Sequence, residues 1–352
     1  MSPAPASRFQ AMRIGVDIMG GDNAPEQILK GCMQAIPLLD QSDRVVMVGD
    51  EEVVRDMLGE RGMLHDPRIE IVATSEVIGM DEPPVEAMKA KKNSSIVVMN
   101  QMASPRAENR LDVVISAGNT GACVAASQYF MRRLPGVVRP GICVTVPTFS
   151  GPIVLIDVGA NIEPKPSHLA QYGVMGDVYA REILGNPHPR VALMNVGGEE
   201  QKGTDLMRSA RDMIRRFEDL NFTGFVEGRG VFDGEADVVI TDGVVGNVML
   251  KLAEGLSGGI FRALAHEVLE SDPELVLRLE GVIKSLYAKH DYHEYGGAPL
   301  LGVNGVSLIS HGSSKDRTIK NAILRGKAFA NARINEKIVA RLATVKMEQV
   351  EA

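Results

Sequence analysis

The segment "VDIMGGDNAPEQILKG", residues 16–31, leads from an apolar run into two glycines and then into a proline-started helical stretch. This strand–turn–helix outline is typical of loops that bind phosphate at a helix N-terminus. The segment nevertheless lacks both the GxGxxG pattern of dinucleotide sites and the GxxxxGK[ST] pattern of P-loops. It therefore predicts an α/β fold and leaves open which ligand the turn holds.

Further short runs rich in β-branched residues are followed by similar turns. Most of them are continuously apolar, as expected of strands buried on both faces of a largely parallel sheet. Helical spacing fills segments such as 167–184 and 247–269, so the chain predicts a three-layer, doubly wound α/β fold. The predicted strands are 13–19, 44–49, 69–74, 112–117, 142–147, 153–158, 190–196, 221–227, 237–242 and 305–310.

The composition fits a folded protein, with 45% hydrophobic and 24% charged residues among 352. We expect a disordered tail over 1–12 and one α/β domain over 13–346, with a central cleft and a helical hairpin at 252–290. The start lacks the apolar core of a signal peptide, so we expect a cytoplasmic chain. Its three cysteines should then be reduced, and Cys123 should be buried in a helix rather than act as a nucleophile.

The net charge is −7, which argues against nucleic acid as the main partner. A local basic patch on such a chain can still bind an acidic partner. The densest basic runs are 89–92, 131–139 and 208–216, and the alternative is that each is a solvated helix face.

Small polar residues gather where the predicted strands end. In an open parallel sheet these turns meet at the carboxyl edge of the strands, where helix N-termini favour an anion. Any one such turn is more often only a tight turn, and Asn119 or Thr120 can equally cap a helix. We predict phosphate contacts at Gly20, Gly21, Asp22, Ser116, Gly118, Asn119, Thr120 and Gly121.

Two other strand ends carry candidate catalytic groups. After Asp157, the sequence offers Lys165 to neutralise a phosphate or an oxyanion and His168 to donate or shuttle a proton. The alternatives are a solvated lysine and a histidine with a structural hydrogen bond, and Ser167 is the expected helix N-cap. "TDGVVGN" at 241–247 adds Asp242 and Asn247. Aspartates at strand ends more often cap turns than bind metal, and we expect no metal or other cofactor.

Segment 252–290 reads as two helices with a break at 271–273. Its apolar stripe indicates a core or dimer face, and the alternative is a surface for protein or membrane.

The motifs together resemble one family closely, the bacterial phosphate acyltransferases (PlsX family). The matching stretches, which extend from about 13 to beyond 314, are "VDIMGGDNAP", "DEPPVEAMKAKKNSS", "SAGNTGA", "DVGANIEPKPSHLAQY", "NVGGEEQKG", "TDGVVGNVMLK", "YGGAPLLGVNG" and "HGSS". The resemblance implies a fold related to phosphate acetyltransferases and isocitrate-type dehydrogenases, and a homodimer. It also implies transfer of a long-chain fatty acyl group from acyl carrier protein to inorganic phosphate, giving acyl phosphate for a membrane glycerol-phosphate acyltransferase.

Under this resemblance, bound phosphate attacks the thioester directly, and the protein contributes proximity and oxyanion stabilisation. Lys165, Asn247 and His168 would serve the oxyanion and the leaving group, and Asp242 would orient a neighbour. Acyl carrier protein is acidic, so the basic runs become candidate docking sites. These are Arg208, Arg211, Arg215 and Arg216 first, and Lys89, Lys91 and Lys92 second.

Two other functions remain open from the sequence. One is a phosphate acetyltransferase-like enzyme that uses acyl-coenzyme A, and the other is a non-catalytic anion-sensing scaffold of lipid metabolism. Under the resemblance to the phosphate acyltransferases, the hairpin at 252–290 would form a wall of the groove for the long acyl chain. It could also bring the enzyme to a membrane surface as a peripheral protein.

Overall fold

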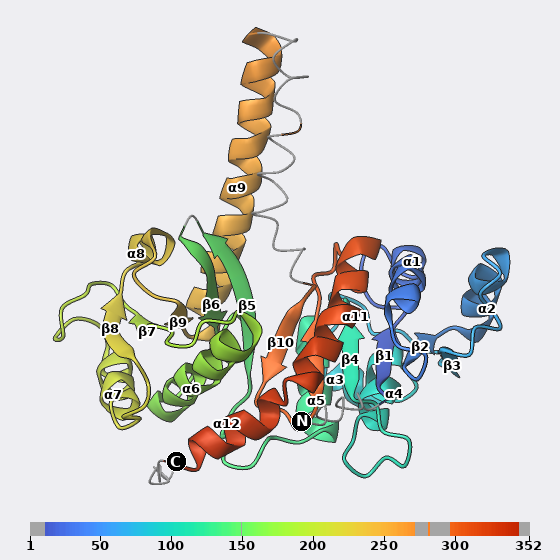
Figure 1. The fold of residues 1–352 in the computed structure, drawn as a ribbon, viewed down its shortest axis with the longest axis horizontal. Coiled ribbons are helices and arrows are strands. Elements are labelled where there is room, and N and C mark those ends of the chain that lie inside the picture. Colours follow the sequence, from blue (N-terminus) through green and yellow to red (C-terminus); the bar gives the residue numbers. More distant parts are fainter. Residues whose placement is uncertain (1–10, 149, 272–280, 282–295, 345–352) are drawn as a thin grey trace, which may run out of the picture. The chain divides into compact units, whose positions relative to one another are not determined.

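The computed structural model describes residues 11–148, 150–271, 281 and 296–344. The chain forms two compact units, each built from two separate stretches (Figure 1). Unit 1 comprises Met1–Arg132 and Val303–Arg333, and unit 2 comprises Arg133–Gly302 and Ile334–Ala352. The prediction of a single domain over 13–346 with a central cleft stays a prediction.

Unit 1 contains five parallel strands in the order β3-β2-β1-β4-β11. The strands are β1 (Arg13–Asp17), β2 (Arg44–Gly49), β3 (Ile69–Ala73), β4 (Val113–Ser116) and β11 (Val306–Ile309). Its α-helices are α1 (Glu26–Ala35), α2 (Glu51–Glu60), α3 (Pro84–Ala90), α4 (Ser95–Met102), α5 (Thr120–Phe130) and α11 (Asp316–Asn331), and Ile36–Leu38 is a 3₁₀ turn.

Helices cover both faces of the unit 1 strands. Gly15 of β1 faces Met99 of α4, whereas Val113 of β4 faces Gly326 of α11. Val113 is the register partner of Ile14, and neighbouring residues of one strand point to opposite faces. The helices α4 and α11 therefore pack on opposite sides, which explains the continuously apolar strands.

Unit 2 has six strands in the order β10-β5-β6-β9-β7-β8. They are β5 (Gly141–Thr148), β6 (Gly151–Ile156), β7 (Val191–Met194), β8 (Phe222–Val226), β9 (Val238–Ile240) and β10 (Ala298–Leu301). The pairs β10–β5 and β5–β6 are antiparallel, and β6–β9, β9–β7 and β7–β8 are parallel. Its helices are α6 (Pro166–Ile183), α7 (Asp205–Ile214), α8 (Gly228–Asp233), α9 (Gly243–Ser271) and α12 (Ile334–Leu342).

The helix α6 is the core helix of unit 2. Every residue from His168 to Ala180 is buried. Two glycines let it approach the strands closely, because a Cβ on Gly173 would lie 2.9 Å from Ile240 and one on Gly176 would lie 2.6 Å from Val238. This close packing fixes the N-terminus of α6 at the carboxyl ends of β6 and β9.

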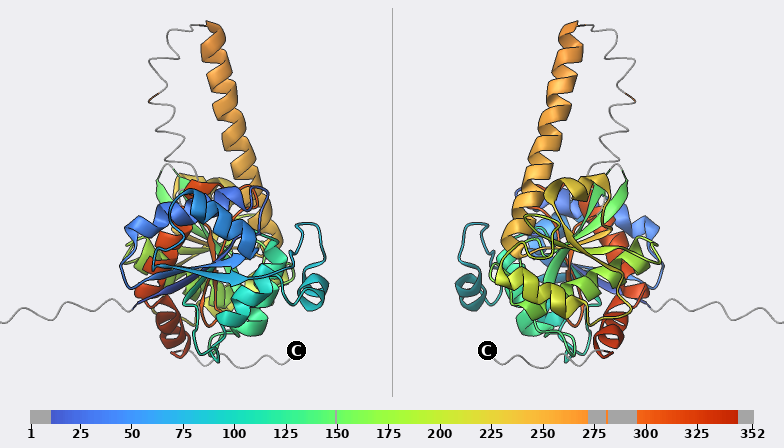
Figure 2. Two further views of the ribbon diagram at one scale, coloured as in Figure 1. Left: turned by 90° about the vertical axis from the view of Figure 1, so that its right-hand side faces the viewer. Right: turned by 90° about the vertical axis from the view of Figure 1, so that its left-hand side faces the viewer.

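The helix α9 leaves the unit 2 strands after its first turns and continues as one straight helix (Figures 1 and 2). It exposes a stripe of apolar residues, namely Val248, Leu252, Leu256, Ile260 and Leu264. Among the described helices, its segment Gly243–Leu264 is long and apolar enough to cross a membrane by length and composition alone. The described part of α9 ends at Ser271, where the sequence predicts a break, and the second helix of the predicted hairpin lies outside the described residues.

All ten predicted strands are present, so the predicted α/β, largely parallel fold is confirmed. The sequence reading missed β10, and it did not anticipate the antiparallel hairpin of β5 and β6. The predicted helices at 167–184 and 247–269 correspond to α6 and α9. The tail at 1–12 is described only from residue 11, and the rest of it lies outside the described residues.

Candidate functional site

In unit 1, the turns that follow β1 and β4 meet at a buried carboxylate. Asp17, the last residue of β1, is fully buried and accepts hydrogen bonds from the Ser116 hydroxyl at 2.7 Å and the Met19 amide at 3.1 Å. Burial raises the pKa of Asp17, although bonds from Ser95 and Ser116 oppose the rise. Asp17 thus holds the turn after β1 against the turn after β4.

Glycines allow these two turns and the turn after β11 to touch. A Cβ on Gly20 would overlap the Asp17 carboxylate and lie 2.7 Å from the Gly118 nitrogen. Gly21 has a φ of +103°, a conformation that L side chains rarely adopt. The Asp22 amide donates to the Gly312 carbonyl at 2.8 Å, and Asn23 donates to the Ser313 carbonyl at 3.0 Å. We call this set of turns, 17–23, 116–121 and 310–314, the glycine rim.

Asn119 caps a helix, which is the alternative that the sequence left open. Its side-chain oxygen accepts from the Ala122 amide at 3.0 Å, and its amide donates to the carbonyls of Gly79, Met80 and Glu82. Since all its polar atoms are committed, its side chain positions the start of α5. In the described part of the chain, no group accepts from the amides of Thr120 and Gly121, so these two N–H groups remain available to an anion.

In unit 2, a second buried carboxylate organises the turn after β6. Asp157 is fully buried, and its oxygens accept from the amides of Ile142, Gly159, Ala160 and Asn161. Burial raises the pKa of Asp157 above its ordinary value, against the lowering effect of these bonds. Asp157 has no capacity left for a metal or a proton transfer, and its contacts are those of a positioning residue.

The start of α9 packs directly on this turn. The Gly243 amide donates to the Asn161 carbonyl at 2.8 Å, and the Thr241 hydroxyl donates to the Asp157 carbonyl at 2.7 Å. Asp242 accepts from the amides of Val244 and Val245 at 2.9 and 2.8 Å and so caps α9. Asn247 follows one turn later and is exposed, with no side-chain partner in the described part of the chain.

The other end of the same turn leads into α6. Lys165, not Ser167 as predicted, is the N-cap of α6, because the fixed φ of Pro166 suits the first helical position. The Lys165 ammonium is exposed and forms no ion pair with any described residue. Asn247 and Lys165 therefore both lie at the carboxyl ends of the neighbouring parallel strands β9 and β6.

His168 lies three residues into α6 and is only 6% exposed. Its Nδ1 accepts the Lys165 amide proton at 3.1 Å, so the neutral ring carries its hydrogen on Nε2. Desolvation lowers the pKa of His168 to about 4, and repulsion by Arg139, Lys165 and Arg133 adds to this. At neutral pH His168 is thus a neutral hydrogen-bond donor through Nε2, which does not support the proton shuttle that the sequence suggested.

We expect the ring signals of His168 to titrate near pH 4 rather than near 6.5 in an NMR titration, with the assignment made by their loss in His168→Gln. Because the unfolded chain takes up this proton first, the stability that His168 contributes should be complete above pH 6.5. It should decline as the pH falls toward 4. A midpoint at or above 6.5 would contradict the buried, neutral ring.

Cys123 is not a candidate nucleophile. It is 2% exposed, and burial raises the pKa of its thiol to about 12. Cys32 and Cys143 are likewise free and buried. Among the described residues no group of three His, Cys, Asp or Glu side chains could hold a metal ion.

The basic runs are partly neutralised by carboxylates of their own unit. On α7, Arg208 pairs with Asp205, and both Arg211 and Arg215 pair with Glu200. Arg216 is exposed and forms no ion pair with a described residue. In unit 1, Lys91 pairs with Glu82, whereas Lys89 and Lys92 form no ion pair in the described ranges. Docking of a carrier protein on either run stays a prediction.

The structure groups the predicted residues into two sets. The eight phosphate candidates belong to the glycine rim of unit 1, and Lys165, His168, Asp242 and Asn247 belong to unit 2. Sequence reasoning did not single out Asp17, although a carboxylate that ends an otherwise apolar strand was the available signal. It also did not connect the run 131–139 with Lys165 and His168.

Comparison with known proteins agrees with this geometry. The model of a family described as "Fatty acid synthesis protein" matches residues 12–337. A phosphate acyltransferase of Heliobacterium modesticaldum is 44% identical over 314 residues, covering 89% of this chain and 92% of that protein. One of Pelobacter propionicus is 40% identical over 342 residues, covering 97% of both.

Solved structures support the fold. The EutD phosphotransacetylase from Staphylococcus aureus aligns with a TM-score of 0.60 at 16% identity, covering 92% of this chain and 95% of that one. A phosphotransacetylase from Streptococcus pyogenes also gives 0.60, at 18% identity, over 91% of this chain and 94% of the other. At these identities, the alignments establish a shared architecture only.

Proposed function

The chain belongs to the phosphate acyltransferase family, and from this premise we propose that it moves a long-chain fatty acyl group from acyl carrier protein to inorganic phosphate. The product is an acyl phosphate for phospholipid synthesis. The observation that carries the proposal is the glycine rim, where the amides of Thr120 and Gly121, which donate to no described residue, lie beside turns that require glycine. Such a rim can bind a small inorganic anion and does not require that the anion be part of a nucleotide.

The proposed reaction is a direct displacement. A phosphate oxygen forms a bond to the thioester carbonyl carbon, and the C–S bond breaks to release the carrier thiolate. Phosphate is already an anion at neutral pH, so the step needs no strong base, and the buried Cys123 supports a route without an acyl-enzyme. Lys165 and Asn247 would stabilise the oxyanion and the departing thiolate, with the neutral His168 Nε2–H as a further donor.

Thiol release tests this function. Purified protein is incubated with long-chain acyl carrier protein, with and without phosphate, and free carrier thiol is measured. We expect release that depends on phosphate, and slower release when acyl-coenzyme A replaces the carrier. A preference for acyl-coenzyme A would favour the acetyltransferase-like alternative, and no phosphate-dependent release from either donor would refute the proposal.

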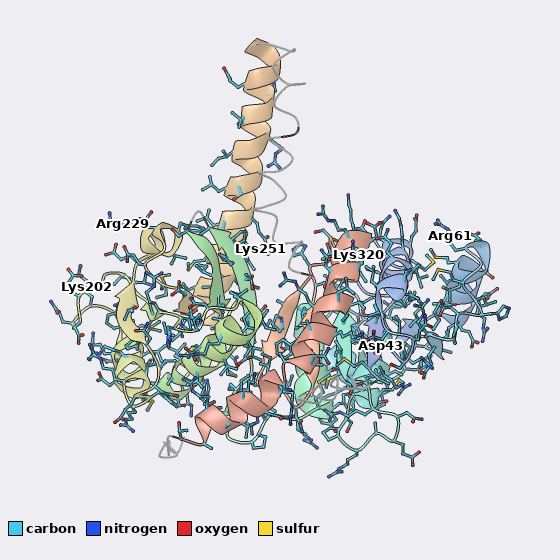
Figure 3. All side chains as sticks on the ribbon, viewed as in Figure 1. Asp43, Arg61, Lys202, Arg229, Lys251 and Lys320 are labelled. Atoms are coloured by element: carbon cyan, nitrogen blue, oxygen red, sulfur yellow. The ribbon has the colours of Figure 1, made fainter. Side chains whose placement is uncertain are left out.

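Replacement of the two exposed polar groups at the strand ends should slow acyl transfer strongly. We expect Lys165→Ala and Asn247→Ala each to lower kcat by about 100-fold, the usual effect of removing one oxyanion donor. The matched control is Lys251→Ala, since Lys251 lies on the same helix as Asn247 but pairs with Glu254 at 3.0 Å (Figure 3). Full activity of both test variants at subsaturating phosphate would remove these residues from the mechanism.

We further propose a homodimer in the cytoplasm with peripheral membrane contact, supported by the exposed apolar stripe on α9. The five residues of this stripe are 46–66% exposed, and such a large exposed apolar patch is uncommon on a monomer in water. Sedimentation of the purified protein tests the dimer, and flotation with anionic vesicles tests membrane contact. If the protein sediments as a monomer and does not float with the vesicles, the apolar stripe serves neither dimerisation nor membrane contact.

A further inference from the structure

In unit 2, residues 133–139 of the basic run 131–139 lie beside α6. The loop 133–140 is tied to α6 by Gln171, which accepts from the Val138 amide and donates to the Gly136 carbonyl, both at 2.8 Å. The Asn161 side chain binds the Pro140 carbonyl at 2.7 Å. Because Gln171 lies three residues after His168, the loop is held against the first turns of α6.

This arrangement brings together cations that form no ion pair with a carboxylate of the described residues. The Arg133 guanidinium donates to the Val138 carbonyl, beside Arg139. Arg139 is exposed, and neither it nor Lys165 forms an ion pair with any residue that the structure describes. Both arginines and Lys165 lie close enough to His168 to repel its protonated form. Three like charges are thus gathered at the N-terminus of an 18-residue helix.

A largely buried histidine at the same place has a donor nitrogen that no described residue accepts from. His168 is only 6% exposed, yet its Nε2–H has no partner among the described residues. The hydrogen bond that the ring forms with a described residue, Lys165, uses the opposite nitrogen, Nδ1. A neutral donor of this kind among three cations is suited to an oxyanion that accepts from several directions.

We propose that Arg133, Arg139, Lys165 and the His168 Nε2–H form a binding site for a phosphoryl group. A tetrahedral phosphoryl anion can accept hydrogen bonds from all four of these donors, because its oxygens point in several directions. A carboxylate has one charge and two oxygens in one plane, so it matches fewer of them. The site rests on the proposed function for its choice of ligand. Two sources share the chemistry, namely free inorganic phosphate and the phosphate ester of the pantetheine arm that carries the acyl group.

His168 itself provides a local readout that needs no turnover. Its ring signals, assigned by their loss in His168→Gln, are followed while inorganic phosphate, 4′-phosphopantetheine or pantetheine is added. We expect a phosphoryl ligand to shift the signals and pantetheine to leave them unchanged. A shift with inorganic phosphate would place the acceptor at this site instead of the glycine rim, and a shift with 4′-phosphopantetheine but not with phosphate would identify the donor arm.

Charge removal completes the test. Arg139→Gln should lower the affinity for the phosphoryl ligand about 10- to 100-fold, which is the usual effect of losing one charge-assisted hydrogen bond. Arg139→Lys, which keeps the charge, should lose less. The control Arg229→Gln should bind as the wild type does, because Arg229 (labelled in Figure 3) belongs to the same unit but is not among the cations that repel the protonated His168.

Unchanged His168 signals with every ligand, or wild-type affinity in Arg139→Gln, would overturn the site. Circular dichroism confirms that each variant is folded. Thiol release from wild-type protein tests the acyl transfer separately, so the two proposals can fail independently.

Discussion

Replacement of Gly246 by alanine is expected to displace the start of α9 and to abolish most acyl transfer. A Cβ at this position would overlap the Asp157 carbonyl oxygen and lie 2.5 Å from the Thr241 hydroxyl. The Asp157 carbonyl belongs to the backbone and Thr241 is buried, so neither can move aside as a flexible side chain would. The helix α9 therefore has to move. Asn247 moves with it, and a misplacement of about 1 Å can cost about 100-fold in rate.

The Gly246→Ala variant should also lose about 3 kcal/mol of stability, the upper range for overpacking a buried site. Thermal unfolding and thiol-release kinetics measure the two effects. Gly255→Ala is the matched control on the same helix, because nothing lies within 4 Å of its Cβ. It should be neutral or slightly stabilising, since alanine favours a helix more than glycine does. Equal behaviour of the two variants would contradict the packing of α9 on Asp157.

Replacement of Gly20 by alanine is expected to damage phosphate binding at the glycine rim. The added Cβ would push the Asp17 carboxylate and the Gly118 amide apart. Since Asp17 binds Ser116, the turns after β1 and β4 would separate together. We expect kcat/KM for phosphate to fall about 100-fold, with a loss of about 1–3 kcal/mol in stability.

Initial rates at varied phosphate and a fixed acyl donor measure this effect, which should appear mainly in the KM for phosphate. Gly59→Ala serves as the control in the same unit, because its Cβ would meet nothing within 4 Å on α2. If Gly20→Ala raised only the KM for the acyl donor, the rim would hold a part of the donor instead of phosphate.

Most of the fold was readable because buried parallel strands have a strong signature. The interiors of runs such as 44–49 and 112–117, namely 45–48 and 113–115, are apolar throughout, and both faces of β2 and β4 are in fact buried. The strand β10 escaped because Ala298–Leu301 contains a proline and no β-branched residue, and follows two glycines. Its position beside β5 depends on antiparallel pairing with a distant segment, which no local sequence pattern predicts.

The site was predictable in its turns but less so in its side chains. Glycine and strand ends are local features, so Gly20, Gly21 and Gly118 could be singled out from the sequence. Whether Asn119 reaches a ligand or the carbonyls of Gly79 and Met80 depends on a loop some forty positions away. The state of His168 likewise depends on burial and on arginines from another segment, which spacing alone does not reveal.

The register of β4 has a consequence for synthesis of the chain. Val113 pairs with Ile14 on one side and with Val306 on the other, so the second neighbour of β4 is translated long after the first. Until the ribosome has released that late segment, β4 presents an open, apolar edge. Such an edge invites pairing with other chains, so fragments truncated before β11 should precipitate, and chaperones should engage the nascent protein at this edge.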